Sequence, residues 1–143
     1  MEVEVPVNYL AVLVSALVAM GIGMAWYGPL FGKQWMAMTG ISKEGMKSMA
    51  LSPVVAMVGG LITTLLLMYV FAHTTAFAFA FLGTSGVMGG LSGGFWTWLG
   101  FAVPLTAGSF LWEGKSWKLW FLNACYYLVV LLAAGAIIGG WGT

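Results

Sequence analysis

The sequence contains very little charge. Only 6% of its 143 residues are charged, its basic residues are all lysines, and its acidic residues are all glutamates. An ordinary soluble domain devotes about a quarter of its residues to charge. Because 62% of this chain is hydrophobic, it cannot cover a soluble fold with polar surface. The composition therefore predicts a membrane protein, and a net charge of +1 gives no electrostatic basis for binding nucleic acid.

Residues that bind metals or catalyse reactions are equally scarce. Cys125 is the only cysteine, which excludes a disulfide within the chain and a cysteine-based metal site. His73 is the only histidine, and there is no aspartate to cluster with it. No carboxylate or basic side chain falls deep inside a predicted span, which argues against an ion-driven pump. We therefore predict no metal, no cofactor and no enzymatic activity.

Four long apolar stretches predict four transmembrane helices in one all-α domain, arranged as two hairpins. A helix of about 20 apolar residues crosses the hydrocarbon core of a bilayer. The predicted spans are approximately residues 8–30, 53–73, 85–111 and 116–138. Asn8 and Ser52 are the expected N-caps of the first two, and Pro53 suits a first helical position. Because Glu2 and Glu4 replace the positive start of a secretory signal, we expect the first span to be retained.

Two connecting segments have a distinct character. Within the amphipathic segment of residues 34–50 the sequence predicts a short helix on the membrane surface, with Ser42 as its N-cap and methionines opposite lysines; a plain polar linker is the alternative. Phenylalanine and alanine alternate over residues 76–81, a period typical of a strand, but an unpaired strand in lipid leaves its backbone unsatisfied. We therefore expect residues 74–84 to extend the second helix or to form an interfacial turn.

The distribution of lysine predicts the orientation. Every lysine falls in the first or the third connection, as Lys33, Lys43, Lys47, Lys115 and Lys118. Cytoplasmic loops carry an excess of basic residues, so residues 31–52 and 112–116 are expected in the cytoplasm and both termini outside. Trp35, Trp112, Trp117 and Trp120 flank these connections as an interfacial belt does. The sequence thus predicts a multi-pass protein of the cytoplasmic membrane, in contact with its lipids.

Glycines repeat at helical spacing in the last two spans. Gly86, Gly90 and Gly94 form one stripe, Gly89 and Gly93 form an adjacent one, and Gly135 and Gly139 repeat the interval. Such faces let transmembrane helices approach closely. Packing within the chain and a subunit interface are both compatible with them, and we expect a homo-oligomer.

A small ligand pocket is a further prediction. Trp96 and Trp98 fall near the middle of the third span, close to a possible kink at Pro104. Asn123, Tyr126 and Tyr127 share one side of the fourth helix, where their polar atoms can bond across helices or line a site. Core packing and lipid contact are the structural alternatives.

Two segments resemble the signature regions of a known family. They are WYGPLFGKQW, residues 26–35, and WEGKSWKLWFLNACYYLV, residues 112–129. Both are similar to those of domain of unknown function 1761, a family of small prokaryotic membrane proteins with four helices. The matching residues are Trp26, Tyr27, Pro29, Phe31, Gly32, Trp35, Glu113, Gly114 and Trp117. The resemblance implies a multi-pass protein of the cytoplasmic membrane and assigns no reaction, ligand or site.

The function expected from these features is non-enzymatic. We predict a self-associating scaffold or a binding module for lipid or another apolar ligand. The alternative is a passive pore or small-solute transporter formed by a homo-oligomer, with Ser92, Thr97 and Thr106 along a hydrated axis.

Overall fold

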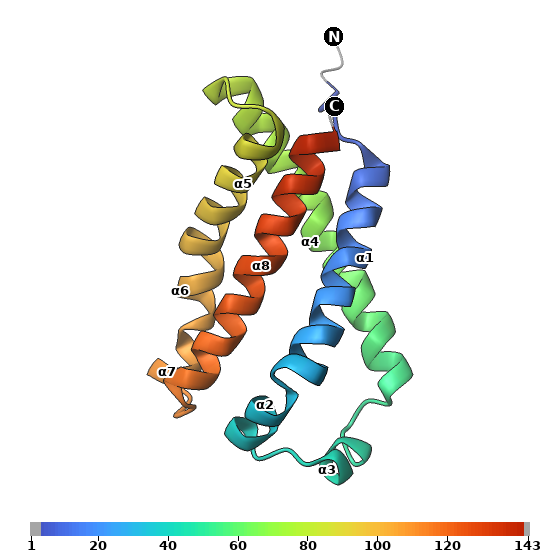
Figure 1. Cartoon of the computed structure of the whole chain (residues 1–143), viewed down its shortest axis with the longest axis vertical. Helices are drawn as coiled ribbons and strands as arrows, with labels where there is room; N and C mark the ends of the chain where they lie inside the picture. The colour runs from blue at the N-terminus through green and yellow to red at the C-terminus, as the bar shows by residue number, and fades with distance from the viewer. Residues whose placement is uncertain (1–3, 142–143) are drawn as a thin grey trace.

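The computed structural model describes residues 4–141, and every regular element in that range is helical (Figure 1). The first helix, α1 (Tyr9–Ala25), begins where predicted, because the Asn8 side chain accepts a hydrogen bond from the Ala11 N–H at 3.1 Å. It continues into a π-helical turn, η1 (Trp26–Leu30), which contains Pro29. The Phe31 N–H donates to the Trp26 carbonyl at 2.8 Å and closes this wider turn.

Two short helices follow, where one amphipathic helix was expected. They are α2 (Gly32–Thr39) and α3 (Lys43–Lys47). Ser42 caps α3 as predicted, by accepting from the Gly45 N–H at 2.9 Å. The predicted helix is wrong in length, because α3 ends at Lys47 and leaves Met49 outside it.

The second long helix, α4 (Pro53–Leu82), begins at the predicted cap, where Ser52 accepts from the Val55 N–H at 3.3 Å. The predicted span ended near His73, and of the two structures expected for residues 74–84 the extension of the second helix is confirmed, because α4 runs on through the phenylalanine and alanine repeat to Leu82. A helix satisfies its own backbone hydrogen bonds, which outweighs the alternating pattern in an apolar setting. Gly83 then ends it in the left-handed conformation, with φ at 66°.

The expected third span is a broken helical segment. It consists of α5 (Gly86–Thr97), the π-helical turn η2 (Trp98–Ala102), α6 (Val103–Thr106) and α7 (Gly108–Leu111). Pro104 has no N–H to donate, so regular α-helical bonding cannot continue through it. The last helix, α8 (Trp117–Trp141), is uninterrupted. Within residues 4–141, three stretches are long and apolar enough to cross a membrane: Tyr9–Leu30, Pro53–Leu82 and Trp117–Trp141.

The core lies where α1, α4 and α8 meet (Figure 1). Its buried residues are Val12, Ala16, Ala19, Met68, Phe71, Ala72, Val130, Leu131 and Ala134. Elsewhere α4 exposes large apolar side chains such as Val54, Ile62 and Leu66, each more than 60% accessible. An apolar surface this extensive is unfavourable in water and compatible with a membrane protein.

The two ends of the molecule differ in charge. Figure 1 shows the start of α1, the end of α8 and the α4–α5 turn at one end, and α2, α3 and α7 at the other. All the lysines lie on α2, α3, the loop after α7 or the first turn of α8, and therefore at this second end. We call it the basic end.

Candidate functional site: a cleft at the basic end

A cleft of about 1030 Å³ opens at the basic end, between the η1–α2 corner and the start of α8. Helices α3, α6 and α7 complete its walls. It is lined by Tyr27, Gly28, Gly32, Lys33, Trp35, Met36, Lys43, Met46, Leu105, Thr106, Gly108, Ser109, Glu113, Trp120, Asn123 and Tyr127. Both signature segments, residues 26–35 and 112–129, therefore contribute to the same cleft.

Aromatic packing shapes the first wall. The rings of Trp26 and Phe31 pack with their centroids 4.6 Å apart, and the ring of Tyr27 meets that of Trp35 edge-on at 6.2 Å. Gly32 has no room for a side chain, because an added Cβ would stand 2.8 Å from the Tyr27 carbonyl oxygen. These contacts fix the turn from η1 into α2 and direct Tyr27 and Trp35 towards the cleft.

The second wall is one face of α8. Trp120, Asn123 and Tyr127 follow one another at helical spacing and all line the cleft. The Trp120 indole N–H donates to the Thr106 hydroxyl at 3.0 Å, which joins α8 to α6. The Thr106 hydroxyl in turn donates to the Ala102 carbonyl, so this pair is held in place from both sides.

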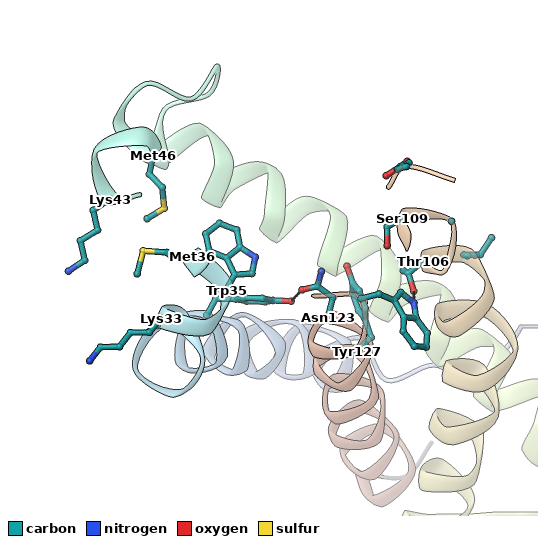
Figure 2. Close-up of a pocket in the computed structure, with 16 residues that line it drawn as sticks. Lys33, Trp35, Met36, Lys43, Met46, Thr106, Ser109, Asn123 and Tyr127 are labelled. Carbon is teal, nitrogen blue, oxygen red and sulfur yellow. Dashed lines mark hydrogen bonds between the residues drawn. The ribbon is translucent and has the colours of Figure 1, made fainter. Parts of the chain in front are cut away.

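One hydrogen bond connects the two walls. The Tyr27 hydroxyl donates to Oδ1 of Asn123 at 2.7 Å (Figure 2). The Tyr27 ring also packs edge-on against Tyr126, with centroids 5.2 Å apart. The amide nitrogen of Asn123 and the hydroxyls of Ser109 and Tyr127 make no hydrogen bond to another residue within residues 4–141. The cleft thus presents unpaired polar atoms beside aromatic and methionine side chains.

The pocket predicted from the sequence is divided in the structure. Asn123 and Tyr127 line the cleft, whereas Tyr126 packs towards α1 and donates to the Ala19 carbonyl at 3.5 Å. Trp98 donates to the Ala124 carbonyl at 2.7 Å, and Trp96, which is 64% exposed, lines a separate cavity of about 260 Å³ between α4 and α5. Residues two apart project to different sides of a helix, so Trp96 and Trp98 do not share a pocket.

The glycine stripes occupy different positions. A Cβ added to Gly90 would overlap the carbonyl of Gly135, one added to Gly94 would overlap that of Leu131, and one added to Gly139 would overlap that of Gly86. The stripe of Gly86, Gly90 and Gly94 therefore faces α8 within the chain. Gly89 and Gly93 line the cavity between α4 and α5 instead.

Most of the remaining signature residues do not line the cleft. Glu113 lines the cleft, and its carboxylate lies 3.7 Å from the Lys115 ammonium. Gly114 has φ at 70° in the loop before α8, and Trp117 is 59% exposed at the start of that helix. Pro29 lies within η1. His73 is not among the residues that line the cleft. Its ring forms a hydrogen bond with the Tyr69 carbonyl at 2.7 Å.

Several lining residues were not predicted as part of a site. Met36, Leu105 and Ser109 come from separate segments whose meeting depends on how α2, α6 and α7 pack. The spacing of Trp120, Asn123 and Tyr127 along α8 was a usable signal for the second wall. Across residues 4–141 there is no group of three or more His, Cys, Asp or Glu side chains placed to hold a metal ion.

The comparisons with known proteins agree with the resemblance of the two signature segments. No curated protein and no solved structure matches the chain. The family model described as "Protein of unknown function (DUF1761)" matches residues 10–139, which covers all the long helices and both walls of the cleft. The chain therefore belongs to the DUF1761 family.

Proposed function

We propose that this protein binds a lipid or a similar amphiphile in the cleft at the basic end. The observation that carries this proposal is the lining of the cleft, which combines apolar side chains with unpaired polar atoms. Ligand sites are typically concave and mostly apolar, with a few polar groups that fix orientation. At about 1030 Å³ the cleft has room for the head group and the first carbons of an acyl chain.

The proposed setting is the cytoplasmic membrane. At about 1.5 Å per residue, the broken segment from Gly86 to Leu111 is long enough to act as the fourth membrane crossing. The excess of lysine supports a cytoplasmic position for the basic end, and hence for residues 31–52 and 112–116. Both termini then face the opposite side, and the cleft opens at the cytoplasmic interface, where phospholipid head groups lie.

Binding is favoured over catalysis by the chemistry of the lining. Glu113 is its only carboxylate, and this group is exposed and paired with Lys115. The lining offers no nucleophile next to a base, which is the usual arrangement for acyl or phosphoryl transfer. We therefore propose a non-enzymatic role.

The pore alternative has less support. Ser92 and Thr97 line the cavity between α4 and α5, whereas Thr106 lines the cleft. These hydroxyls lie in two separate cavities, whereas a solute path needs them along one continuous cavity. Self-association stays a prediction, and it requires surfaces other than the stripe of Gly86, Gly90 and Gly94, because that stripe packs against α8.

A variant that fills the cleft tests the proposal. A Cβ at Gly108 meets only the Trp112 ring at 3.8 Å, so Gly108→Leu adds an apolar side chain to the lining without a backbone clash. Gly59→Leu is the matched control, since a Cβ there has no neighbour within 4 Å and the site is on exposed α4. The measurement is the amount of phospholipid that remains bound to protein purified in mild detergent, counted by native mass spectrometry.

The expected result is a loss of bound phospholipid in Gly108→Leu and wild-type retention in Gly59→Leu. Equal retention by all three proteins would overturn the proposal, because lipid bound around the helices does not depend on the cleft.

A further inference from the structure

Two lysines line one end of the cleft. Lys33 comes from the first turn of α2, and Lys43 begins α3. Figure 2 shows their side chains extending in the same direction, at the end of the cleft opposite Asn123 and Tyr127. Both residues are exposed, and neither has a carboxylate within 4 Å in the part of the chain that the structure describes.

The negative charge of the lining is already compensated. Glu113 is the only acidic residue that lines the cleft, and its carboxylate lies 3.7 Å from Lys115. The ammonium groups of Lys33 and Lys43 therefore carry an excess positive charge. Lys33 lies on α2 and Lys43 on α3, and Figure 2 shows both side chains at one end of the cleft. Basic pockets between transmembrane helices on the cytoplasmic side are suited to anionic lipid head groups.

From this arrangement we propose that the cleft selects an amphiphile with an anionic phosphate ester, whose phosphate binds Lys33 and Lys43. This inference rests on the proposed function and adds the chemical class of the ligand. The amide of Asn123 and the hydroxyls of Ser109 and Tyr127 offer further hydrogen bonds at the other end of the cleft from the lysines. Trp35, Met36 and Met46 form the apolar contact for the first carbons of the chain.

Competition between two phospholipids tests this selectivity. The protein in a neutral detergent is mixed with dioleoyl phosphatidylglycerol and dioleoyl phosphatidylcholine, which share acyl chains and differ in net charge. Native mass spectrometry measures the ratio of the two bound species. The test variant is Lys33→Gln with Lys43→Gln, and the control is Lys47→Gln with Lys118→Gln. The control removes the same charge from the same end, at exposed lysines that do not line the cleft.

We expect wild type and the control to prefer phosphatidylglycerol, and the test variant to lose that preference. A lysine near a charged lipid surface contributes about a fivefold effect, so two correspond to a loss of roughly 25-fold. An equal loss in the control would overturn the inference, because general charge and not the cleft would then set the preference.

Two further outcomes separate this inference from the proposed function. If wild type binds both lipids equally and Gly108→Leu reduces both, the cleft binds amphiphiles but does not select phosphate, and only the inference fails. If neither the substitution of the lysine pair nor Gly108→Leu changes the bound lipid, both the inference and the proposed function fail. Addition of sn-glycerol 3-phosphate identifies the source of the phosphate. If sn-glycerol 3-phosphate displaces phosphatidylglycerol when the two are at equal concentration, the cleft binds a phosphate ester but does not need the lipid chains. That result would overturn the assignment to a lipid.

Discussion

The Tyr27 hydroxyl donates a hydrogen bond to Oδ1 of Asn123 at 2.7 Å and so joins the two walls of the cleft. Tyr27 belongs to the π-helical turn that ends the first long helix, and Asn123 belongs to the second turn of α8. The bond connects the two signature segments of the family across most of the chain. The bond therefore fixes the distance between the two walls that contact the proposed ligand.

Removal of this bond is expected to weaken the fold and open the cleft. Tyr27→Phe keeps the ring packing and removes only the hydroxyl, and hydrogen bonds between membrane helices are worth about 0.6 kcal/mol on average and up to about 1.7. Thermal unfolding in detergent should show a decrease in this range, together with reduced phospholipid retention. Tyr69→Phe is the control, because that hydroxyl is on exposed α4 and makes no hydrogen bond within residues 4–141. Equal stability of the two variants would contradict this account of the bond.

The two glycine stripes of α5 should respond differently to alanine. A Cβ at Gly90 would overlap the Gly135 carbonyl, whereas a Cβ at Gly93 meets only the Thr75 hydroxyl at 4.0 Å. Gly90→Ala must push α5 away from α8, so we expect a loss of about 1–3 kcal/mol in the free energy of unfolding. Gly93→Ala should remain close to wild type. Denaturation of both purified variants in mixed micelles measures the difference, and equal losses would be inconsistent with this packing.

Neighbouring tryptophans on the broken segment provide a second matched pair. Trp98 donates to the Ala124 carbonyl at 2.7 Å, whereas Trp96 is 64% exposed. Trp98→Phe loses a bond worth about 1 kcal/mol and part of its packing, so it should lower the melting temperature. Trp96→Phe should change stability by less than about 0.5 kcal/mol. A larger effect at Trp96 than at Trp98 would show that the orientation of the segment is wrong.

Features that depend on local chemistry could be predicted from the sequence. Asn8, Ser42 and Ser52 cap helices by bonds to residues three positions on, so the pattern along the chain was sufficient to identify them. The three long helices followed from apolar length alone. The family was identified from two short segments whose residues match in order.

The cleft depends on features that no local pattern carries. Its walls meet only because α8 turns Asn123 towards Tyr27, and the rotation of a uniformly apolar helix is set by packing. The same limit explains the divided pocket, since Trp96 and Trp98 looked like neighbours in sequence and face different surroundings. The sequence left residues 74–84 open between an extension of the second helix and an interfacial turn, because the alternating pattern and backbone hydrogen bonding favour different structures there.

The proposed orientation predicts which loops are accessible from each side. In a Cys125→Ser background, a cysteine at Ser48 should react with a membrane-impermeant maleimide only after the cells are permeabilised. A cysteine at Thr84, in the turn between α4 and α5, should react in intact cells, because the positive-inside rule places the lysines in the cytoplasm. The reverse pattern would show that the cleft opens on the outer side, and reaction of both in intact cells would refute the two-sided arrangement.

The central claim, that the cleft holds a phospholipid, is tested most directly by photo-crosslinking. Phosphatidylglycerol with a diazirine near the start of one acyl chain is irradiated with the protein in nanodiscs, and the modified residues are identified by mass spectrometry. The account predicts adducts on Met36, Met46 or Tyr127 that disappear when unlabelled phosphatidylglycerol is added in excess, while adducts on exposed α4 persist. Adducts confined to α4 and other exposed helix faces, with none in the cleft, would contradict it.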